Sequence, residues 1–301
     1  MNRRNFLALS AVLLAAPASS RLASAAVRAP AAHFATNLYP WSTFAKRDGK
    51  PFDGASADLW ADVAKAGFEG IESTGAPTNL AALMASSKLA LRSLYVNSTL
   101  NDPAQSDASI REALAIADAA KPHGCRIIVT NPAPIRWGGP ENKSDDQLIH
   151  QAKSLDKLGT ALRERGMVLA YHNHDIELRN AAREFHHMLA GTDPELVKFC
   201  LDAHWIYRGS GNSQVALFDA VKLYGKRVVE LHIRQSKNGI WSEAFGPGDI
   251  DYKRLHATLK SMDVSPHLVL EQAIEKGSPA TMSAIDAHRQ GLVYASEVFA
   301  A

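Results

Sequence analysis

Carboxylate and imidazole side chains follow the ends of several short apolar segments in this sequence. Such segments are typical of barrel strands, whose carboxyl ends meet at one rim. Gathered there without partners, these side chains would repel one another or be poorly solvated, and a divalent cation is the simplest species that satisfies them together. The sequence therefore predicts a metal site assembled from several segments. These are Glu72, Tyr171-His172-Asn173-His174-Asp175-Ile176-Glu177, Leu201-Asp202-Ala203-His204-Trp205, Glu230-Leu231-His232-Ile233-Arg234 and Leu270-Glu271-Gln272.

The alternation of side chains along a strand selects which of these residues can meet. Residues two positions apart point to the same side of a strand. Asp202, His232 and Glu271 can therefore all point inward at the ends of their strands, and we predict them as metal ligands. Glu230 would also point inward, one layer lower, where an arginine or lysine is expected to pair with it.

The fourth ligand has two candidates in the same segment. Glu177 lies beyond the strand, and the loop could fold it back to the metal; alternatively His172 binds the metal and Glu177 acts as a base or orients another group. We favour Glu177. Three carboxylates and one imidazole favour Mn²⁺, with Co²⁺, Mg²⁺ or Zn²⁺ possible. A second imidazole in place of one carboxylate would shift the preference toward Zn²⁺ or Co²⁺.

Aromatic side chains in the loops that follow strands are candidates for substrate binding. Trp137, Trp205 and Trp241 lie in or beside such loops, and aromatic faces near polar groups suit sugar rings. Glu72 and Asn97 end the predicted second and third strands, and we assign them to substrate binding as well. For each of these residues, packing in the core is the structural alternative.

The elements that must position these residues alternate between short apolar runs and longer amphipathic ones. Eight strand–helix units in about 270 residues match the size of a (β/α)8 barrel. A doubly wound open sheet is the alternative, but no glycine-rich fingerprint follows the first strand. We therefore predict one barrel domain over residues 32–301. The strands are expected within 33–41, 68–72, 89–97, 126–130, 167–172, 197–202, 227–232 and 267–271, and the helices within 58–66, 79–88, 108–121, 145–165, 181–190, 213–224, 251–262 and 279–299.

The first 25 residues have the layout of a secretory signal. Arg3 and Arg4 precede an apolar run that ends near Ala16, and Ala23-Ser24-Ala25 offers a small-residue cleavage site. Paired arginines followed by Phe-Leu resemble a twin-arginine signal, which predicts export to the periplasm. A general secretory signal is the alternative. The apolar run is far below the ~20 residues that a membrane anchor needs.

Composition and charge exclude several classes of partner. The chain has 301 residues, 46% of them hydrophobic, and a formal net charge of +2. That balance gives no electrostatic reason to bind nucleic acid or an anionic membrane. Cys125 and Cys200 lie in apolar runs and are expected to be buried thiols rather than a disulfide. The oligomeric state is left open.

At these motifs the chain resembles the sugar phosphate isomerase/epimerase superfamily, with its xylose isomerase-like barrel. The resemblance rests on the segments that end the fifth to eighth strands, on Lys237 after His232, and on Phe245-Gly246-Pro247-Gly248-Asp249-Ile250-Asp251. It implies a metal held by an acidic residue of strand five together with Asp202, His232 and Glu271. It also places Lys237 among the substrate-binding residues. Strands with a His-Asn-His sequence look similar to those of dehydratase-like members and of lyases acting on 3-keto-glycosides.

Two related reactions are expected on a carbohydrate substrate. In a metal-dependent isomerase or epimerase, Glu271 or Glu177 removes the proton next to a carbonyl group, and His232 and His204 are nearby donors. In a lyase or dehydratase acting on a 3-keto-glycoside or an inosose-like compound, the same step is followed by loss of a β-substituent, which His172 or His174 would protonate. A non-catalytic periplasmic sugar-binding protein and a metal nuclease are the alternatives from other classes.

Overall fold

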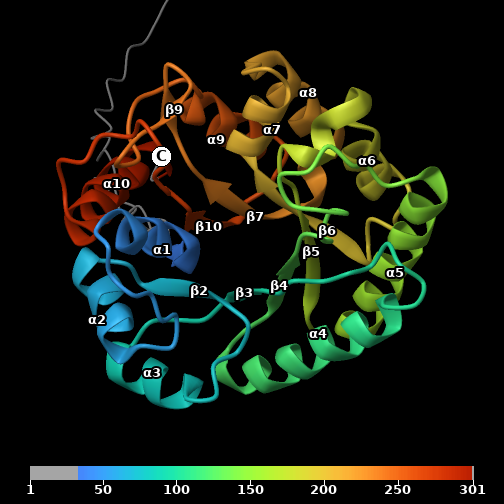
Figure 1. Ribbon diagram of the computed structural model, residues 1–301, viewed down its shortest axis with the longest axis horizontal. Coiled ribbons are helices and arrows are strands. Elements are labelled where there is room, and N and C mark those ends of the chain that lie inside the picture. Colours follow the sequence, from blue (N-terminus) through green and yellow to red (C-terminus); the bar gives the residue numbers. More distant parts are fainter. Residues whose placement is uncertain (1–32, 300–301) are drawn as a thin grey trace, which may run out of the picture. The chain divides into compact units, whose positions relative to one another are not determined.

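The computed structural model describes residues 33–299, which form a closed barrel of eight parallel strands surrounded by helices (Figure 1). The barrel strands are β1 (Phe34–Asn37), β2 (Gly70–Thr74), β3 (Ser93–Tyr95), β4 (Ile127–Thr130), β5 (Val168–His172), β6 (Val197–Asp202), β7 (Val228–Ile233) and β10 (His267–Leu270). The α-helices are α1 (Leu38–Arg47), α2 (Ala57–Ala66), α3 (Leu80–Ser87), α4 (Ser106–Ala120), α5 (Asp145–Glu164), α6 (Arg179–Ala190), α7 (Ala203–Gly209), α8 (Gln214–Tyr224), α9 (Tyr252–Ser261) and α10 (Ala284–Phe299). The predicted (β/α)8 barrel is confirmed.

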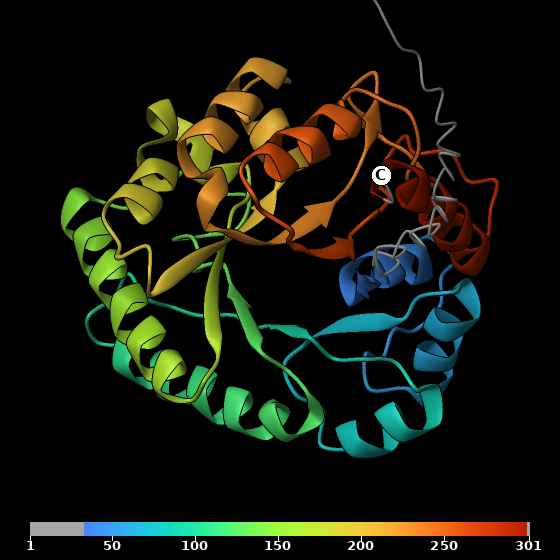
Figure 2. The same cartoon turned by 180° about the vertical axis from the view of Figure 1, so that it is seen from behind.

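The strands follow one another around the barrel in sequence order, and β10 closes it by pairing with β1. Helices form an outer ring around the strands, as the view from behind also shows (Figure 2). The main apolar core lies between these two layers and includes Trp60, Leu94, Leu155 and Phe199, each with no exposed surface. The helix stripes and the outward faces of the strands therefore supply the core, and the barrel interior is left for other side chains.

Three elements at the carboxyl ends of strands are absent from the prediction. They are α1, α7 and the antiparallel hairpin of β8 (Ser236–Lys237) and β9 (Ile240–Trp241). Polar strand ends start both helices: Asn37 Oδ1 accepts a hydrogen bond from the N–H of Tyr39 at 2.7 Å, and Asp202 Oδ1 accepts one from that of Trp205 at 2.8 Å. Such N-caps favour helix initiation, so the same residues end a strand and begin a helix.

The register of the strands sets the level of the polar side chains. Asp202 of β6 pairs with His232 of β7, and His232 pairs in turn with Val269 of β10. Glu271 follows directly after β10, and His172 is the last residue of β5. Side chains from four consecutive barrel strands therefore reach one level at the carboxyl-terminal rim, where barrel enzymes carry their active sites.

The predicted export signal, residues 1–25, lies outside the described residues. Among the residues that the structure describes, no helix is both long and apolar enough to span a membrane. Both cysteines, Cys125 and Cys200, are buried and free, as expected.

Candidate active site

Four buried side chains meet at the carboxyl-terminal rim of the barrel: His172, Asp202, His232 and Glu271. Each offers one ligand atom, and these atoms all lie within 4.8 Å of one another. His172 Nε2 is 3.7 Å from Asp202 Oδ2, and His232 Nδ1 is 3.3 Å from Glu271 Oε2. None of the four is more than 6% exposed. The three ligands expected from strand alternation are thus brought together, and His172 completes the group.

The chemistry of the unpartnered atoms tests whether a cation suits this group. Asp202 Oδ2 and both ring nitrogens of His172 are buried and have no hydrogen-bond partner within residues 33–299. Buried polar atoms without partners are costly, so native structures nearly always satisfy them. Two carboxylates and two imidazoles are ordinary ligands for a divalent transition metal. The residues present therefore fit a divalent metal ion.

A second layer of carboxylates lies beneath His232, inside the barrel. His232 Nε2 is 3.1 Å from Glu230 Oε1 and 3.3 Å from Glu72 Oε2. Asn37 and Ser93 donate hydrogen bonds to Glu72. The partner of Glu230 is thus an imidazole, and the expected arginine or lysine is replaced because the pleat brings His232 above it. Glu72 is completely buried and is not among the residues that line the cavity described below.

Burial and neighbouring charges shift the pKa values of these groups in opposite directions. Burial disfavours the ionised form of Glu271, but Arg234 and His232 outweigh it and hold the pKa of this carboxyl well below its usual range. Burial raises the pKa of Asp202 to about 6, although Arg234 opposes the shift. Burial, together with the charge of His232, lowers the pKa of His172 to about 3. Glu271 is therefore the carboxylate that is most firmly ionised, and His172 is a neutral imidazole.

Glu177, the favoured fourth ligand, takes a different position. Its carboxylate accepts hydrogen bonds from Asn131 Nδ2 at 3.1 Å and from the N–H of His174 at 2.6 Å. It is buried and is not part of the group of four. Burial raises its pKa to about 7. The loop folds back as expected, but it brings Glu177 to Asn131, directly after β4, rather than into the group of four.

Arg234 is a central residue that sequence reasoning missed. It is fully buried, its Nη2 donates to Glu271 Oε2 at 2.6 Å, and its Nε donates to the backbone oxygen of Glu271 at 3.0 Å. Its guanidinium lies 4.4 Å from the ring centroid of Trp241 and 4.8 Å from that of Trp205. Nη1 is buried without a partner in the described part of the chain. Its spacing in the sequence could have indicated it, because residues 232 and 234 are two positions apart at the end of β7 and therefore point to the same side of the chain.

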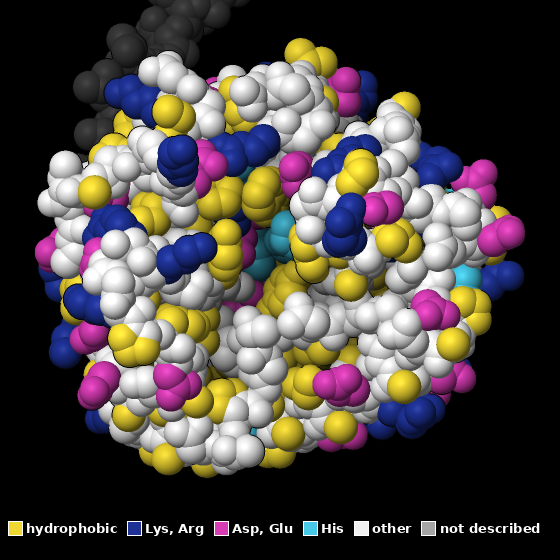
Figure 3. Space-filling model, viewed as in Figure 1, with side chains coloured by type: hydrophobic (Ala, Val, Ile, Leu, Met, Phe, Trp, Pro, Cys, Tyr) yellow, Lys and Arg dark blue, Asp and Glu magenta, His cyan; other side chains and the backbone are white. Residues whose placement is uncertain are grey.

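A cavity of about 460 Å³ opens beside the group of four. Figure 3 shows a central hollow with histidine side chains on this face of the molecule. Glu271 belongs both to this cavity and to the metal-ligand group. Of the residues predicted by sequence, Asn97, Trp137, Trp205 and His174 also line it. The remaining lining residues are Asn37, Tyr39, Thr74, Tyr95, Asp175 and Arg234.

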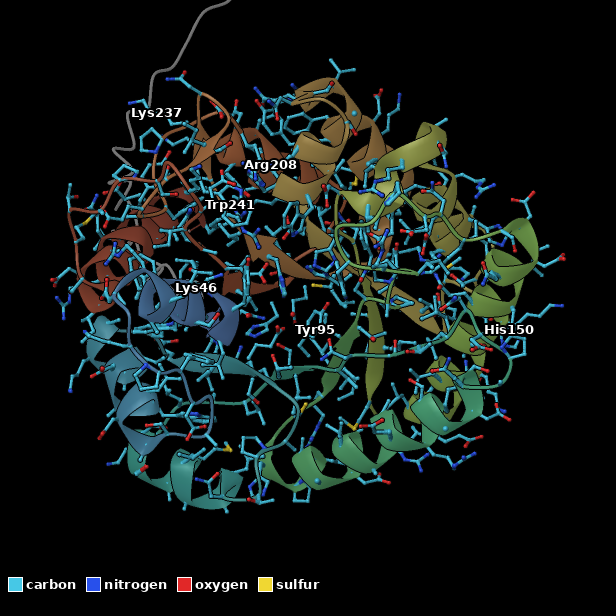
Figure 4. All side chains as sticks on the ribbon, viewed as in Figure 1. Lys46, Tyr95, His150, Arg208, Lys237 and Trp241 are labelled. Carbon is cyan, nitrogen blue, oxygen red and sulfur yellow. The ribbon has the colours of Figure 1, made fainter. Side chains whose placement is uncertain are left out.

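Three predicted site residues lie elsewhere. Lys237 is exposed on the β8–β9 hairpin, and Figure 4 shows it near the periphery, away from Tyr95 of the cavity. Trp241 is 5% exposed and packs under Arg234 without lining the cavity. His204 is buried, its ring lies about 6 Å from those of Trp205 and Trp241, and burial lowers its pKa to about 2. Trp241 and His204 therefore pack behind the residues that line the cavity, and Lys237 lies outside the site. The reason is that α7 and the β8–β9 hairpin turn away from the direction of the strands.

Known proteins share this architecture. The chain is 27% identical over 139 residues to an inosose dehydratase of Clostridium perfringens, a match that covers 40% of this chain and 45% of that protein. Its fold is similar to that of the 3-keto-D-glucoside 4-epimerase YcjR from E. coli, with 16% identity and a TM-score of 0.65 over 87% of this chain and 98% of the other. It is also similar to a xylose isomerase-like TIM barrel protein from Mycobacterium smegmatis in complex with magnesium, with 16% identity and a TM-score of 0.67 over 89% and 96% of the two chains.

A family model described as xylose isomerase-like TIM barrel matches residues 60–292. This range contains His172, Asp202, His232 and Glu271, and it covers all the barrel strands except β1. The chain therefore belongs to the xylose isomerase-like TIM barrel family.

Proposed function

We propose that this protein is a metal-dependent enzyme of the isomerase/epimerase class that removes the proton next to the carbonyl group of a keto-sugar or a polyol derivative. The observation that carries the proposal is the buried group of His172, Asp202, His232 and Glu271, which reaches through Glu271 a cavity lined by polar and aromatic side chains. A sugar ring presents an apolar face and polar hydroxyl groups, and indole and phenol rings beside polar side chains can contact both. A non-catalytic sugar-binding protein would have no use for this buried ligand group.

The proposed metal ligands are His172, Asp202, His232 and Glu271, with Glu177 outside the set. Relative to three carboxylates and one imidazole, which favour Mn²⁺, the second imidazole shifts the preference toward Zn²⁺ or Co²⁺. When bound, the divalent ion would polarise a substrate carbonyl and stabilise negative charge on its oxygen.

Glu271 is the proposed base. It lines the cavity, and Arg234 and His232 hold its pKa well below the usual range, so that the carboxylate is ionised at neutral pH. As the proton moves from carbon to Glu271, negative charge develops on the substrate oxygen. Arg234 also lines the cavity, and its Nη1 has no partner among the described residues. A buried guanidinium donor of this kind stabilises developing charge without having to reorganise.

The fate of the proton decides the product. Its return from Glu271 to the neighbouring carbon, with a hydroxyl proton moving to the former carbonyl oxygen, gives an isomer. Delivery of a proton from a different donor, such as solvent water, to the opposite face gives an epimer. His174 lines the cavity, and burial lowers its pKa to about 3, so its ring is neutral. A neutral imidazole can still polarise an oxygen by donating a hydrogen bond. We therefore propose that His174 donates a hydrogen bond to a substrate oxygen while Glu271 removes the proton.

β-Elimination is the second candidate. The observation in its favour is the position of Glu177, which is hydrogen-bonded to Asn131 and does not line the cavity. Glu177 is therefore not placed to return a proton to the opposite face of the substrate. His174 would instead assist the departure of a β-oxygen. The partial likeness to an inosose dehydratase and the fold shared with a 3-keto-D-glucoside 4-epimerase support a keto-sugar substrate in either case.

Metal binding distinguishes the two candidate strand-five ligands. We expect His172→Ala to weaken binding of Co²⁺ or Zn²⁺ by at least about tenfold, because it removes a ligand. We expect Glu177→Gln to leave the metal content near that of the wild type, because the amide oxygen can still accept a hydrogen bond from Asn131. Metal content after equilibrium dialysis measures both. Loss of metal in Glu177→Gln with retention in His172→Ala would reverse the assignment.

Proton exchange tests the role of Glu271. Wild-type protein with bound metal should exchange the proton next to the carbonyl of a 3-keto-glycoside for solvent deuterium, as followed by NMR. Glu271→Gln, assayed with saturating metal, should slow exchange by about 10²–10⁴-fold, the usual contribution of a general base. Glu164→Gln, on the exposed face of α5, is the matched control. A new stereoisomer indicates epimerisation, and release of the β-substituent indicates elimination. Full exchange in Glu271→Gln would disprove its role.

The pH profile tests the contact between Arg234 and Glu271. Because Arg234 lowers the pKa of Glu271, Arg234→Gln should raise it. Glu271 must be ionised to accept a proton, so the acidic limb of the kcat/KM profile should move to higher pH. Arg163→Gln, on an exposed part of α5, should leave the limb in place. A lower rate with an unmoved limb would show that Arg234 acts on the substrate without tuning Glu271.

We also propose that residues 1–25 direct export through the twin-arginine route and that the enzyme works in the periplasm. Replacing both Arg3 and Arg4 with lysine should then retain the protein in the cytoplasm, as measured by cell fractionation. Unchanged delivery to the periplasm would instead favour a general secretory signal.

A further inference from the structure

A second cavity, of about 510 Å³, lies beside the first one. It is bounded by residues of α1, the α1–α2 loop and the loop after β2, including Leu38, Tyr39, Phe52, Ser73, Thr74 and Ala76. Tyr39 and Thr74 line both cavities. The two cavities therefore adjoin, and a single ligand can extend from one into the other.

Local contacts fix the walls of this second cavity. The side chain of Asn37 accepts the N–H of Tyr39 and so holds the start of α1. In the opposite wall, Ser73 Oγ donates to the backbone oxygen of Gly75 at 2.8 Å, and the N–H of Gly75 donates to the backbone oxygen of Tyr95 at 2.9 Å. Gly75 has a φ of 71°, a conformation that favours glycine. The walls are thus built by specific hydrogen bonds to the barrel strands.

The lining has the chemistry of a site for a neutral ring. Its two aromatic side chains, Tyr39 and Phe52, are 44% and 40% exposed, so part of each ring is accessible to a ligand. None of the described lining residues is charged: Tyr39, Ser42, Ser73 and Thr74 carry hydroxyl groups, and the rest of the wall is apolar or glycine. The hydroxyl groups of Ser42 and Ser73 donate to backbone oxygens, which leaves their oxygens as acceptors. A phosphate or carboxylate would find no countercharge there. A sugar ring or an aryl group can lay its apolar face on such aromatic side chains while hydroxyl groups satisfy its edge.

Yellow hydrophobic side chains border the central hollow in Figure 3, so an apolar surface continues outward from the metal-ligand group. The first cavity contains Glu271, Arg234 and His174, and under the proposed function it is the place of the ring that reacts. The second cavity contains none of these. The two cavities therefore present surfaces of different chemistry, and Tyr39 and Thr74 lie at the boundary between them.

We propose that the second cavity is a subsite for a neutral ring joined through a glycosidic oxygen to the keto-sugar ring in the first cavity. The substrate is then a keto-glycoside, such as an oxidised disaccharide or aryl glycoside, and not a free keto-monosaccharide. This inference rests on the proposed function for the reacting ring, and it adds the part of the substrate that the metal-ligand group does not contact.

The test compares a methyl 3-keto-glucoside, a 3-keto-disaccharide and a phenyl 3-keto-glucoside. We expect the wild type to exchange deuterium into the two larger compounds with a kcat/KM at least about tenfold higher than for the methyl compound. Phe52→Ala should reduce that ratio by about three- to tenfold, as expected for the loss of one aromatic contact. Phe52→Trp, which keeps an aromatic face, should largely preserve it. Val215→Ala, an exposed position on α8, is the control. A larger ratio for the disaccharide or for the phenyl compound identifies the preferred ring.

Two outcomes would overturn the subsite. One is equal kcat/KM for all three compounds in the wild type, and the other is a ratio that Phe52→Ala leaves unchanged. Failure of the proposed function is recognised separately, because the wild type would then exchange deuterium into none of the compounds. In that case, calorimetric binding of the disaccharide to wild-type and Phe52→Ala protein decides on the subsite: equal affinities reject it, and weaker binding by the variant supports it.

Discussion

The imidazole of His232 joins two layers of the barrel interior, and the arrangement of the site depends on the different neighbours of its two nitrogens. Nδ1 faces Glu271 at the rim, whereas Nε2 faces Glu230 and Glu72 below. A carboxylate at one ring nitrogen fixes the tautomer and the orientation of the ring, which leaves the other nitrogen available as a ligand. The lower layer thus prepares the upper one, and the carboxylates inside the barrel position His232 without facing the cavity.

This polar interior is possible because the barrel closes. Glu230 lies two residues before His232 on β7, whereas Glu72 is on β2, and only a closed ring of strands brings Glu72 to His232. Buried charges are costly unless they are paired and hydrogen-bonded. Here Glu72 pairs with His232 and accepts hydrogen bonds from Asn37 and Ser93. Burial and the charge of Glu72 raise the pKa of Glu230 well above its usual range, so that Glu230 is a neutral carboxyl group beside the small side chain of Cys200. Many TIM barrels fill this volume with branched apolar residues; this barrel uses part of it to support a reactive group.

The sequence predicted the barrel and those parts of the site that obey strand alternation. Asp202, His232 and Glu271 were found because each lies at or directly after a strand end, where the pleat determines the direction of the side chain. Glu177 could not be placed in this way, since its position depends on Asn131, which is 46 residues away. Helices α1 and α7 were missed for a related reason: they start within the polar segments that end strands, so their first residues are typical of loops. Arg234 does not belong to the pattern of carboxylates and imidazoles that predicts the site, although it lies two residues after His232.

The two carboxylate oxygens of Asp202 contact different parts of the structure. Oδ1 holds the first turn of α7 through the N–H of Trp205, and Oδ2 faces His172 across 3.7 Å. Trp205 in turn forms part of the cavity wall and stacks near Arg234. A single carboxylate therefore connects the group of four buried side chains to the wall of the cavity. A substitution that shifts Trp205 and the first turn of α7 would also act on Asp202, so the two parts of the pocket cannot be altered independently at this point.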